Sequence, residues 1–255
     1  MRLLMIDLSD VTTWPVGILE LLAHNSADTR REKAAELEAH LAHRLEPPPC
    51  TVLRRTQHRL ETILKELEIR AFHCSRLLNP QAIRQNGLEV LSPDVAKART
   101  LDVLRQFGVH DSLLTKASLA FDECQKRGDC QHREGFLCFV LTRKSVDGSG
   151  CADFFRYFGG EIARHALDGL RHELFPILAS IGIPTAVEVR LPIVDAQDHQ
   201  VSAIAEELIR FGEHRFLDQK DYAMNCEIRI RYAVPPDRIL DVWTVQPPRN
   251  RHLFR

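Results

Sequence analysis

The sequence predicts an α+β fold in which a helical segment precedes a domain of strands and helices. The first 68 residues carry apolar side chains at the three- and four-residue spacing of helices. After residue 69, short apolar or alternating runs indicate strands, and longer periodic stretches between them indicate helices. We therefore expect a helical N-terminal segment at 1–68 and an α+β domain at 69–255.

Composition and charge exclude several classes of protein. Lysine and arginine total 34 and aspartate and glutamate 35, which argues against a dedicated nucleic-acid binder but leaves a local basic patch open, for example at 249–255. No apolar run reaches the roughly 18 residues that a membrane helix needs. The seven irregularly spaced cysteines fit free thiols in a reducing compartment. We therefore expect a cytoplasmic protein without membrane contact.

The segment 1–68 is expected to contain three helices. Asp10 caps the first helix, which Pro15 opens, and Ser26–Asp28 begins the second. Three consecutive prolines at 47–49 end the second helix, because proline lacks the N–H that a helix interior needs. The third helix covers 51–68. This segment is expected to carry no chemistry and to offer a docking element for a protein partner.

The domain at 69–255 is expected to alternate short strands with helices. The predicted extended segments are 69–74, 88–91, 135–141, 186–193, 227–232 and 239–245. The predicted helices are 80–86, two between 94 and 126, 151–170, 173–181 and 201–211. Asn86-Gly87 is expected to cap the first of these helices, since glycine favours the position just after a helix.

A polar pair, His73 and Arg76, lies at the end of the first strand of the domain, in the stretch AFHCSRL at 71–77. A neutral imidazole hydrogen-bonds a ribose hydroxyl, and a guanidinium binds phosphate through two parallel bonds. The strand end would then present both side chains to a dinucleotide. The alternative is structural, with the imidazole bonded to the backbone and the arginine paired with a carboxylate.

A second candidate stretch is YFGGE at 157–161, within the helix predicted at 151–170. Two adjacent glycines inside a helix cost about 1 kcal/mol each relative to alanine. Such a cost is tolerated where the backbone approaches another group closely or where the helix breaks. A tight contact between helices is one explanation. The other places Tyr157 and Phe158 against a flat ring, with Glu161 nearby.

Glu227 is the first residue of a predicted strand. A carboxylate there is ordinarily a solvated edge residue. In glycosyl transfer from a nicotinamide dinucleotide, however, the ribose acquires oxocarbenium character, and a carboxylate bonded to its 2-hydroxyl stabilises that charge. The same carboxylate can orient the incoming nucleophile.

Other kinds of site are disfavoured by motif. Cys124, Cys130 and His132 lie close together in the sequence, but their spacing matches no usual zinc pattern, so no metal is expected. The motifs of Rossmann dehydrogenases, P-loop NTPases, nucleophile-elbow hydrolases and zincins are absent.

The order of His73, Tyr157 and Glu227 along the chain resembles the His–Tyr–Glu arrangement of the ADP-ribosyltransferase fold. The segments FHCSRL, REGFLCFVL, YFGGE and CEIRIRYAVPPDRIL are also similar to those of a family of uncharacterised bacterial proteins. That family usually has WGGE in the third segment, so Phe158 stands in place of a tryptophan. The similarity covers about residues 55 to 245 and implies a split, mixed or antiparallel sheet with helices.

The resemblance also implies an activity, with NAD as a substrate. His73 would hold a ribose, Tyr157 and Phe158 would lie against the nicotinamide, and Arg76 would meet a phosphate. Glu227 would bond the ribose 2-hydroxyl, with Glu161 as a second candidate for the essential carboxylate. ADP-ribose would pass to an acceptor that the sequence leaves open among protein, nucleic acid, a small molecule and water. A toxin or phage-defence role is a common context for this fold.

Two alternatives remain. The same fold supports RNA 2′-phosphotransfer, which relies on basic residues that grip phosphate, and here only Arg76 and Arg133 are suggestively placed. The domain can also be a non-catalytic binding or regulatory module, for which Phe158 would reflect a degenerate site.

Overall fold

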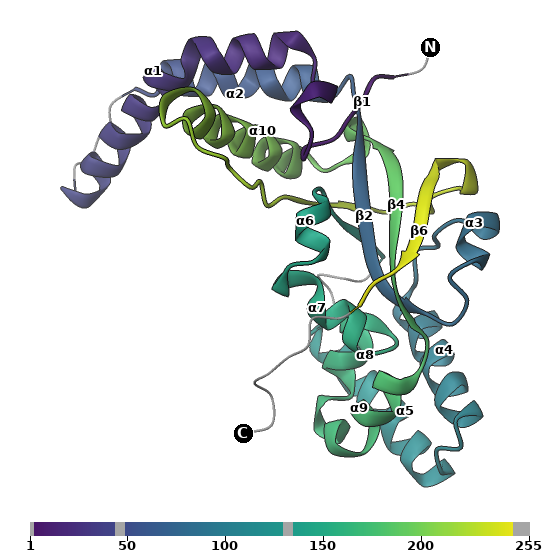
Figure 1. The fold of residues 1–255 in the computed structure, drawn as a ribbon. Helices are drawn as coiled ribbons and strands as arrows, with labels where there is room; N and C mark the ends of the chain where they lie inside the picture. Colours follow the sequence, from purple (N-terminus) through teal and green to yellow (C-terminus); the bar gives the residue numbers. More distant parts are fainter. Residues whose placement is uncertain (1–2, 44–48, 130–134, 247–255) are drawn as a thin grey trace. The chain divides into compact units, whose positions relative to one another are not determined.

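The computed structural model describes residues 3–43, 49–129 and 135–246, and it confirms an α+β fold (Figure 1). The chain divides into two compact units. Unit 1 contains residues 1–70 and 190–228, and unit 2 contains 71–189 and 229–255. The unit that holds the predicted N-terminal segment 1–68 therefore also includes 190–228, which the sequence had assigned to the following domain.

The helices of unit 1 are α1 (Val16–Leu41), α2 (Thr51–Leu64) and α10 (Asp198–Gly212). The helix α2 packs against both of the others, because one side of it is apolar and includes the fully buried Leu60 and Leu64. Unit 1 also contains the short helical turns η1 (Val11–Thr13), η3 (Ile193–Asp195) and η4 (Glu213–Leu217), and unit 2 contains η5 (Pro236–Arg238).

The break expected at Ser26–Asp28 was wrong, because α1 continues through it. Ser26 is buried, and its hydroxyl donates to the Leu22 carbonyl one turn earlier at 2.5 Å. A serine that bonds back to its own helix in this way does not begin a new one. The predicted cap by Asp10 is present, but it precedes η1 and not α1.

The sheet contains six strands. They are β1 (Met5–Ile6), β2 (Glu68–Leu77), β3 (Leu137–Val140), β4 (Ile183–Pro192), β5 (Glu227–Ile230) and β6 (Ile239–Thr244). Their order is β5-β3-β2-β4-β6, with β1 joined to β2. The β2–β3 and β4–β6 pairs are antiparallel and the β1–β2 pair is parallel, so the expected mixed sheet is confirmed. The sequence had not predicted β1.

Unit 2 also contains helices and one short helical turn. They are α3 (Ala82–Asn86), α4 (Pro93–Gln106), α5 (Asp111–Arg127), α6 (Arg143–Val146), α7 (Ser149–Arg156), α8 (Gly160–Ala166), η2 (Asp168–Leu170) and α9 (Arg171–Ser180). One apolar cluster joins α4, α5, α8 and α9. A second lies on the sheet and includes Phe72, Cys74, Cys151 and Phe155.

The helix predicted at 151–170 was wrong, because the chain breaks between α7 and α8. Gly159 and Gly160 have φ angles of +87° and +63°, a conformation that residues with a side chain rarely adopt. A Cβ on Gly159 would lie 2.6 Å from the Ala163 Cβ and 3.0 Å from the Thr100 hydroxyl. The two glycines are therefore explained by the break and by the close approach of α4.

The turn after α3 confirms the predicted glycine cap. Gly87 has a φ of +76°, and its N–H donates to the Ile83 carbonyl. A Cβ at this position would lie 2.1 Å from the Val234 oxygen. Leu88 and Val234 form an isolated antiparallel bridge, so within the predicted extended stretch 88–91 it is Leu88 that pairs with another segment.

None of the helices in the described part of the chain combines the length and the apolar character that crossing a membrane requires.

Candidate functional site

His73 is held by a hydrogen bond across two neighbouring strands. Its Nδ1 lies 3.0 Å from the Cys138 carbonyl oxygen, and its ring lies 5.7 Å from that of Phe139. Burial lowers the pKa of the imidazole below its ordinary value, against the opposing effect of this hydrogen bond. A neutral ring beside a carbonyl must carry its proton on Nδ1, so Nε2 is the acceptor. The side chain is half-buried.

Arg76 has a different environment, because it lies on the other face of β2. Its guanidinium donates to four main-chain carbonyls, of Ile181 (2.7 Å), Phe155 (2.9 Å), Gly182 (3.0 Å) and Arg156 (3.5 Å). Burial lowers its pKa, yet an arginine stays charged at neutral pH. These bonds give Arg76 a structural part, which ties the end of α7 to the turn before β4.

The strand therefore does not present His73 and Arg76 together. The predicted strand ended at residue 74, whereas β2 continues to Leu77 and both residues lie within it. Side chains three positions apart in a strand point to opposite faces. Arg76 shares the face of Phe72 and Cys74, which pack against Phe155 of α7.

Tyr157 and Phe158 follow α7 and pack against the helical cluster of unit 2. The Tyr157 ring lies 4.6 Å from the Phe175 ring, at an angle of 40°. The Phe158 N–H donates to the Leu178 carbonyl at 3.1 Å. Both side chains are half-buried, and Arg76 bonds the carbonyls of the two residues just before Tyr157.

The two candidate carboxylates lie in different units. Glu161 is half-buried in the first turn of α8, in unit 2. Glu227 is exposed and is the first residue of β5, in unit 1. The predicted strand start at Glu227 is thus confirmed, and a catalytic part for either carboxylate stays a prediction.

Two cysteines are in contact in the sheet cluster of unit 2. The thiol of Cys74 bonds that of Cys151, and this bond together with burial raises the pKa of Cys74 far above its ordinary value. The Cys74 thiol is therefore protonated and unreactive at neutral pH. Within residues 3–43, 49–129 and 135–246, no group of three or more His, Cys, Asp or Glu side chains has the arrangement of a metal site. Cys130, His132, Arg133 and the tail at 249–255 lie outside the described residues.

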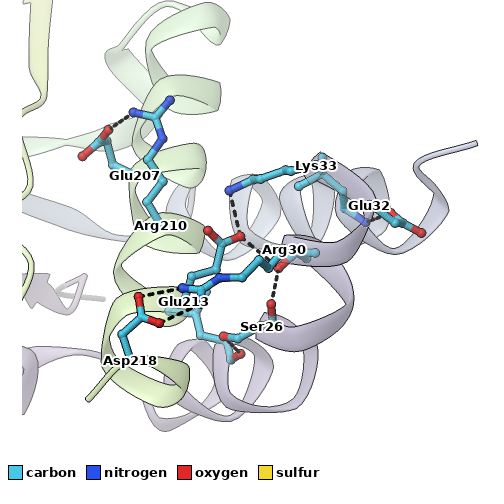
Figure 2. Close-up of polar contacts among 11 residues, drawn as sticks. Ser26, Arg30, Glu32, Lys33, Glu207, Arg210, Glu213 and Asp218 are labelled. Carbon is cyan, nitrogen blue, oxygen red and sulfur yellow. Dashed lines mark hydrogen bonds and ion pairs between the residues drawn. The ribbon is translucent and has the colours of Figure 1, made fainter. Parts of the chain in front are cut away.

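Unit 1 contains a polar network that the sequence did not reveal, shown in Figure 2. Arg30 of α1 bonds both carboxylate oxygens of Asp218, at 2.7 and 2.9 Å, and its hydrogen bond lowers the pKa of Asp218. Lys33 bonds the buried Glu213 at 2.9 Å. Glu213 begins the π-helical turn η4, a rare structure that is frequent at functional sites.

A second part of this network holds the segment that leads into β5. The buried Glu207 of α10 accepts hydrogen bonds from the Tyr222 hydroxyl at 2.8 Å, from Arg210 at 2.5 Å and from the Asn225 N–H at 3.4 Å. Burial, together with the bond to Glu207, raises the pKa of Tyr222. Burial also raises the pKa of Cys226, to about 12. Glu207 therefore holds Tyr222 and Asn225, which shortly precede Glu227.

Comparisons with models of protein families, with curated proteins and with solved structures gave no match.

Proposed function

We propose that the chain cleaves the nicotinamide–ribose bond of NAD and transfers ADP-ribose to an acceptor. The observation that supports this proposal is the fixed tautomer of His73. With its proton held on Nδ1 by the Cys138 carbonyl, the imidazole offers Nε2 as an acceptor for a ribose hydroxyl. The lowered pKa keeps that nitrogen unprotonated at neutral pH.

The proposed reaction breaks the bond between the ribose anomeric carbon and the nicotinamide nitrogen. The electron pair of that bond leaves with nicotinamide, and the sugar develops positive charge. A carboxylate near the 2-hydroxyl stabilises that charge. In the proposal Glu227 is the carboxylate that stabilises this charge, and Glu161 is the alternative. The acceptor then forms the new bond at the anomeric carbon and gives up its proton, with water as the simplest acceptor.

The test is nicotinamide release from NAD by the purified protein, with and without cell extract as a source of acceptor. Removing a group that stabilises transition-state charge typically costs 10²–10³-fold in rate. We expect a loss of about that size in Glu227→Gln or in Glu161→Gln, whichever is the essential carboxylate. His73→Ala should raise the Michaelis constant for NAD. Glu206→Gln is the matched control, because Glu206 is an exposed residue of α10.

Nicotinamide release that is unchanged in both Glu227→Gln and Glu161→Gln would remove both carboxylates from the mechanism. If wild-type protein releases no nicotinamide under any of these conditions, the proposal fails.

A specific observation favours a second candidate, a non-catalytic binding or regulatory module. Two residues expected to contact NAD have structural partners, since the Arg76 guanidinium bonds carbonyls and the Tyr157 ring packs on Phe175. Calorimetry with NAD separates the two candidates. Binding of NAD without nicotinamide release would support the module.

A further inference from the structure

The helix α2 of unit 1 has one strongly basic face. Its buried side includes Thr56, Leu60 and Leu64. The opposite side exposes four basic residues within two turns, which we call the basic face: Arg54, Arg55, His58 and Arg59. At a rise of about 1.5 Å per residue, these four positions span about 7.5 Å along the helix axis.

Among the described residues, the three arginines of the basic face have no acidic partner of the kind that several other cations of unit 1 have. Arg30, Lys33 and Arg210 are each paired with a carboxylate (Figure 2). In the described part of the chain, by contrast, no ion pair involves the three arginines of the basic face. The fourth member of the basic face is His58. Its Nδ1 lies 3.9 Å from a carboxylate oxygen of Glu61, and its side chain is 85% exposed.

Three carboxylates of α1 and α2 already have other partners. Glu32 accepts hydrogen bonds from the N–H groups of Val52 and Leu53 at the start of α2, at 3.1 and 2.8 Å. Glu61 accepts a bond from the Ser202 hydroxyl at 2.6 Å. Glu36 forms a side-chain hydrogen bond with Cys50, the residue just before α2. Within the described part of the chain, these carboxylates therefore do not neutralise the positive charge of the basic face.

We propose that the basic face of α2 binds the phosphate backbone of a double-stranded nucleic acid. This goes beyond the proposed NAD cleavage and does not depend on it. The positive charges of three arginines complement the negative charges of the phosphates, and this charge term supplies most of sequence-independent binding. A protein partner would need an apolar centre for its interface, and no large apolar residue of α2 is exposed. A single strand would need aromatic side chains for stacking, and α2 contains no Phe, Tyr or Trp.

The size of the expected effect follows from the number of phosphates reached. Three arginines over this length contact about three phosphates, so the logarithm of the binding constant should fall with the logarithm of salt concentration with a slope of about −2.7. Between 50 and 200 mM salt the affinity should then fall by about 40-fold. Binding should not depend on base sequence, because backbone contacts carry no sequence information.

The experiment is fluorescence anisotropy of a labelled 20-base-pair duplex, titrated with the full chain at several salt concentrations. Arg55→Ala/Arg59→Ala should weaken binding at 50 mM salt by more than about tenfold and bring the slope to about −1. Arg55→Lys/Arg59→Lys should retain most of the affinity. The matched control, Lys116→Ala/Lys126→Ala, removes two exposed cations from α5 and should change affinity less than about twofold.

Several results would overturn the proposal. One is the absence of duplex binding by the wild-type protein at 50 mM salt. Another is an equal loss of affinity in the α5 control or in the lysine variant. Tighter binding of poly-glutamate than of the duplex would identify an acidic protein as the partner instead, and tighter binding of the unpaired strand would exclude the duplex.

Discussion

Replacing Arg76 with alanine removes a guanidinium that joins separate stretches of main chain in unit 2. The side chain donates to the carbonyls of Phe155 and Arg156 at the end of α7, and of Ile181 and Gly182 before β4. In the alanine variant these carbonyls lose a charged donor, and those that stay shielded from water lose hydrogen bonding altogether. Stability of unit 2 should therefore fall even though no ion pair is broken.

The magnitude follows from the geometry of these bonds. Three are between 2.7 and 3.0 Å, and the fourth, at 3.5 Å, is weak. A hydrogen bond to a charged group contributes about 1.5–3 kcal/mol. Because Arg76 is half-buried and water replaces part of each bond, we take about 1 kcal/mol for each short bond. The expected loss is about 3 kcal/mol for Arg76→Ala. It is about 1.5 kcal/mol for Arg76→Lys, whose compact ammonium lacks the fork.

Urea unfolding followed by tryptophan fluorescence measures this loss. The chain has two tryptophans, Trp14 in unit 1 and Trp243 in unit 2, and Trp243 packs against Phe72 in the sheet cluster. In a Trp14→Phe background the signal therefore reports unit 2. Arg84→Ala is the control, because it breaks one half-exposed ion pair and should cost less than about 1 kcal/mol.

The reasoning about Arg76 is refuted if Arg76→Ala lowers the free energy of unfolding by less than the Arg84→Ala control. It is also refuted if Arg76→Lys unfolds at the same urea concentration as the parent protein, since a single ammonium would then replace the whole fork.

Three further predictions concern stability and reactivity. Gly87→Ala should cost more than about 2 kcal/mol of stability, because the new Cβ would meet a backbone oxygen. Gly108 has a similar φ but open space around it, so Gly108→Ala should cost about 1 kcal/mol. Equal shifts in melting temperature for the two variants would contradict this. Burial opposes ionisation of Glu32, but the hydrogen bonds that it accepts from the start of α2 lower its pKa. The stability that the ionised carboxylate adds is therefore present above about pH 5, and it is lost as the pH falls through this lowered pKa. The melting difference between wild type and Glu32→Gln should therefore shrink on acidification, unlike that for the exposed Glu38→Gln. Cys226, with a pKa of about 12, should resist iodoacetamide at pH 8 until urea unfolds the protein, and mass spectrometry of the native protein checks this.

Much of the fold was predictable because the relevant signals are local. The apolar run at 135–141 predicted β3, and the alternation at 186–193 predicted β4. Gly87 correctly predicted the end of α3, which it follows directly. The break expected at Ser26–Asp28 failed because a serine can cap a helix or bond back within one, and only tertiary burial decides between the two.

The candidate site was less predictable, because it depends on which face of a strand each side chain occupies and on contacts between residues far apart in the sequence. His73 and Arg76 are close in sequence, but their odd spacing places them on opposite faces of β2, as the alternation of side chains along a strand requires. The partners of Arg76 are carbonyls about 80 to 105 residues away, and no residue type reveals a carbonyl as an acceptor. The contacts of Glu207 and Glu213 likewise depend on tertiary structure: Lys33 of α1 reaches Glu213 of η4, and Tyr222 returns to Glu207 of α10.

The division of the chain affects the order in which it can fold during synthesis. Residues 1–70 complete their compact unit only with 190–228, so the early helices leave the ribosome long before α10 can cover them. Contacts between such distant segments slow folding, and apolar surface on α1 and α2 stays uncovered in the meantime. A nascent chain arrested before residue 190 should therefore be a better chaperone substrate than one arrested after residue 228.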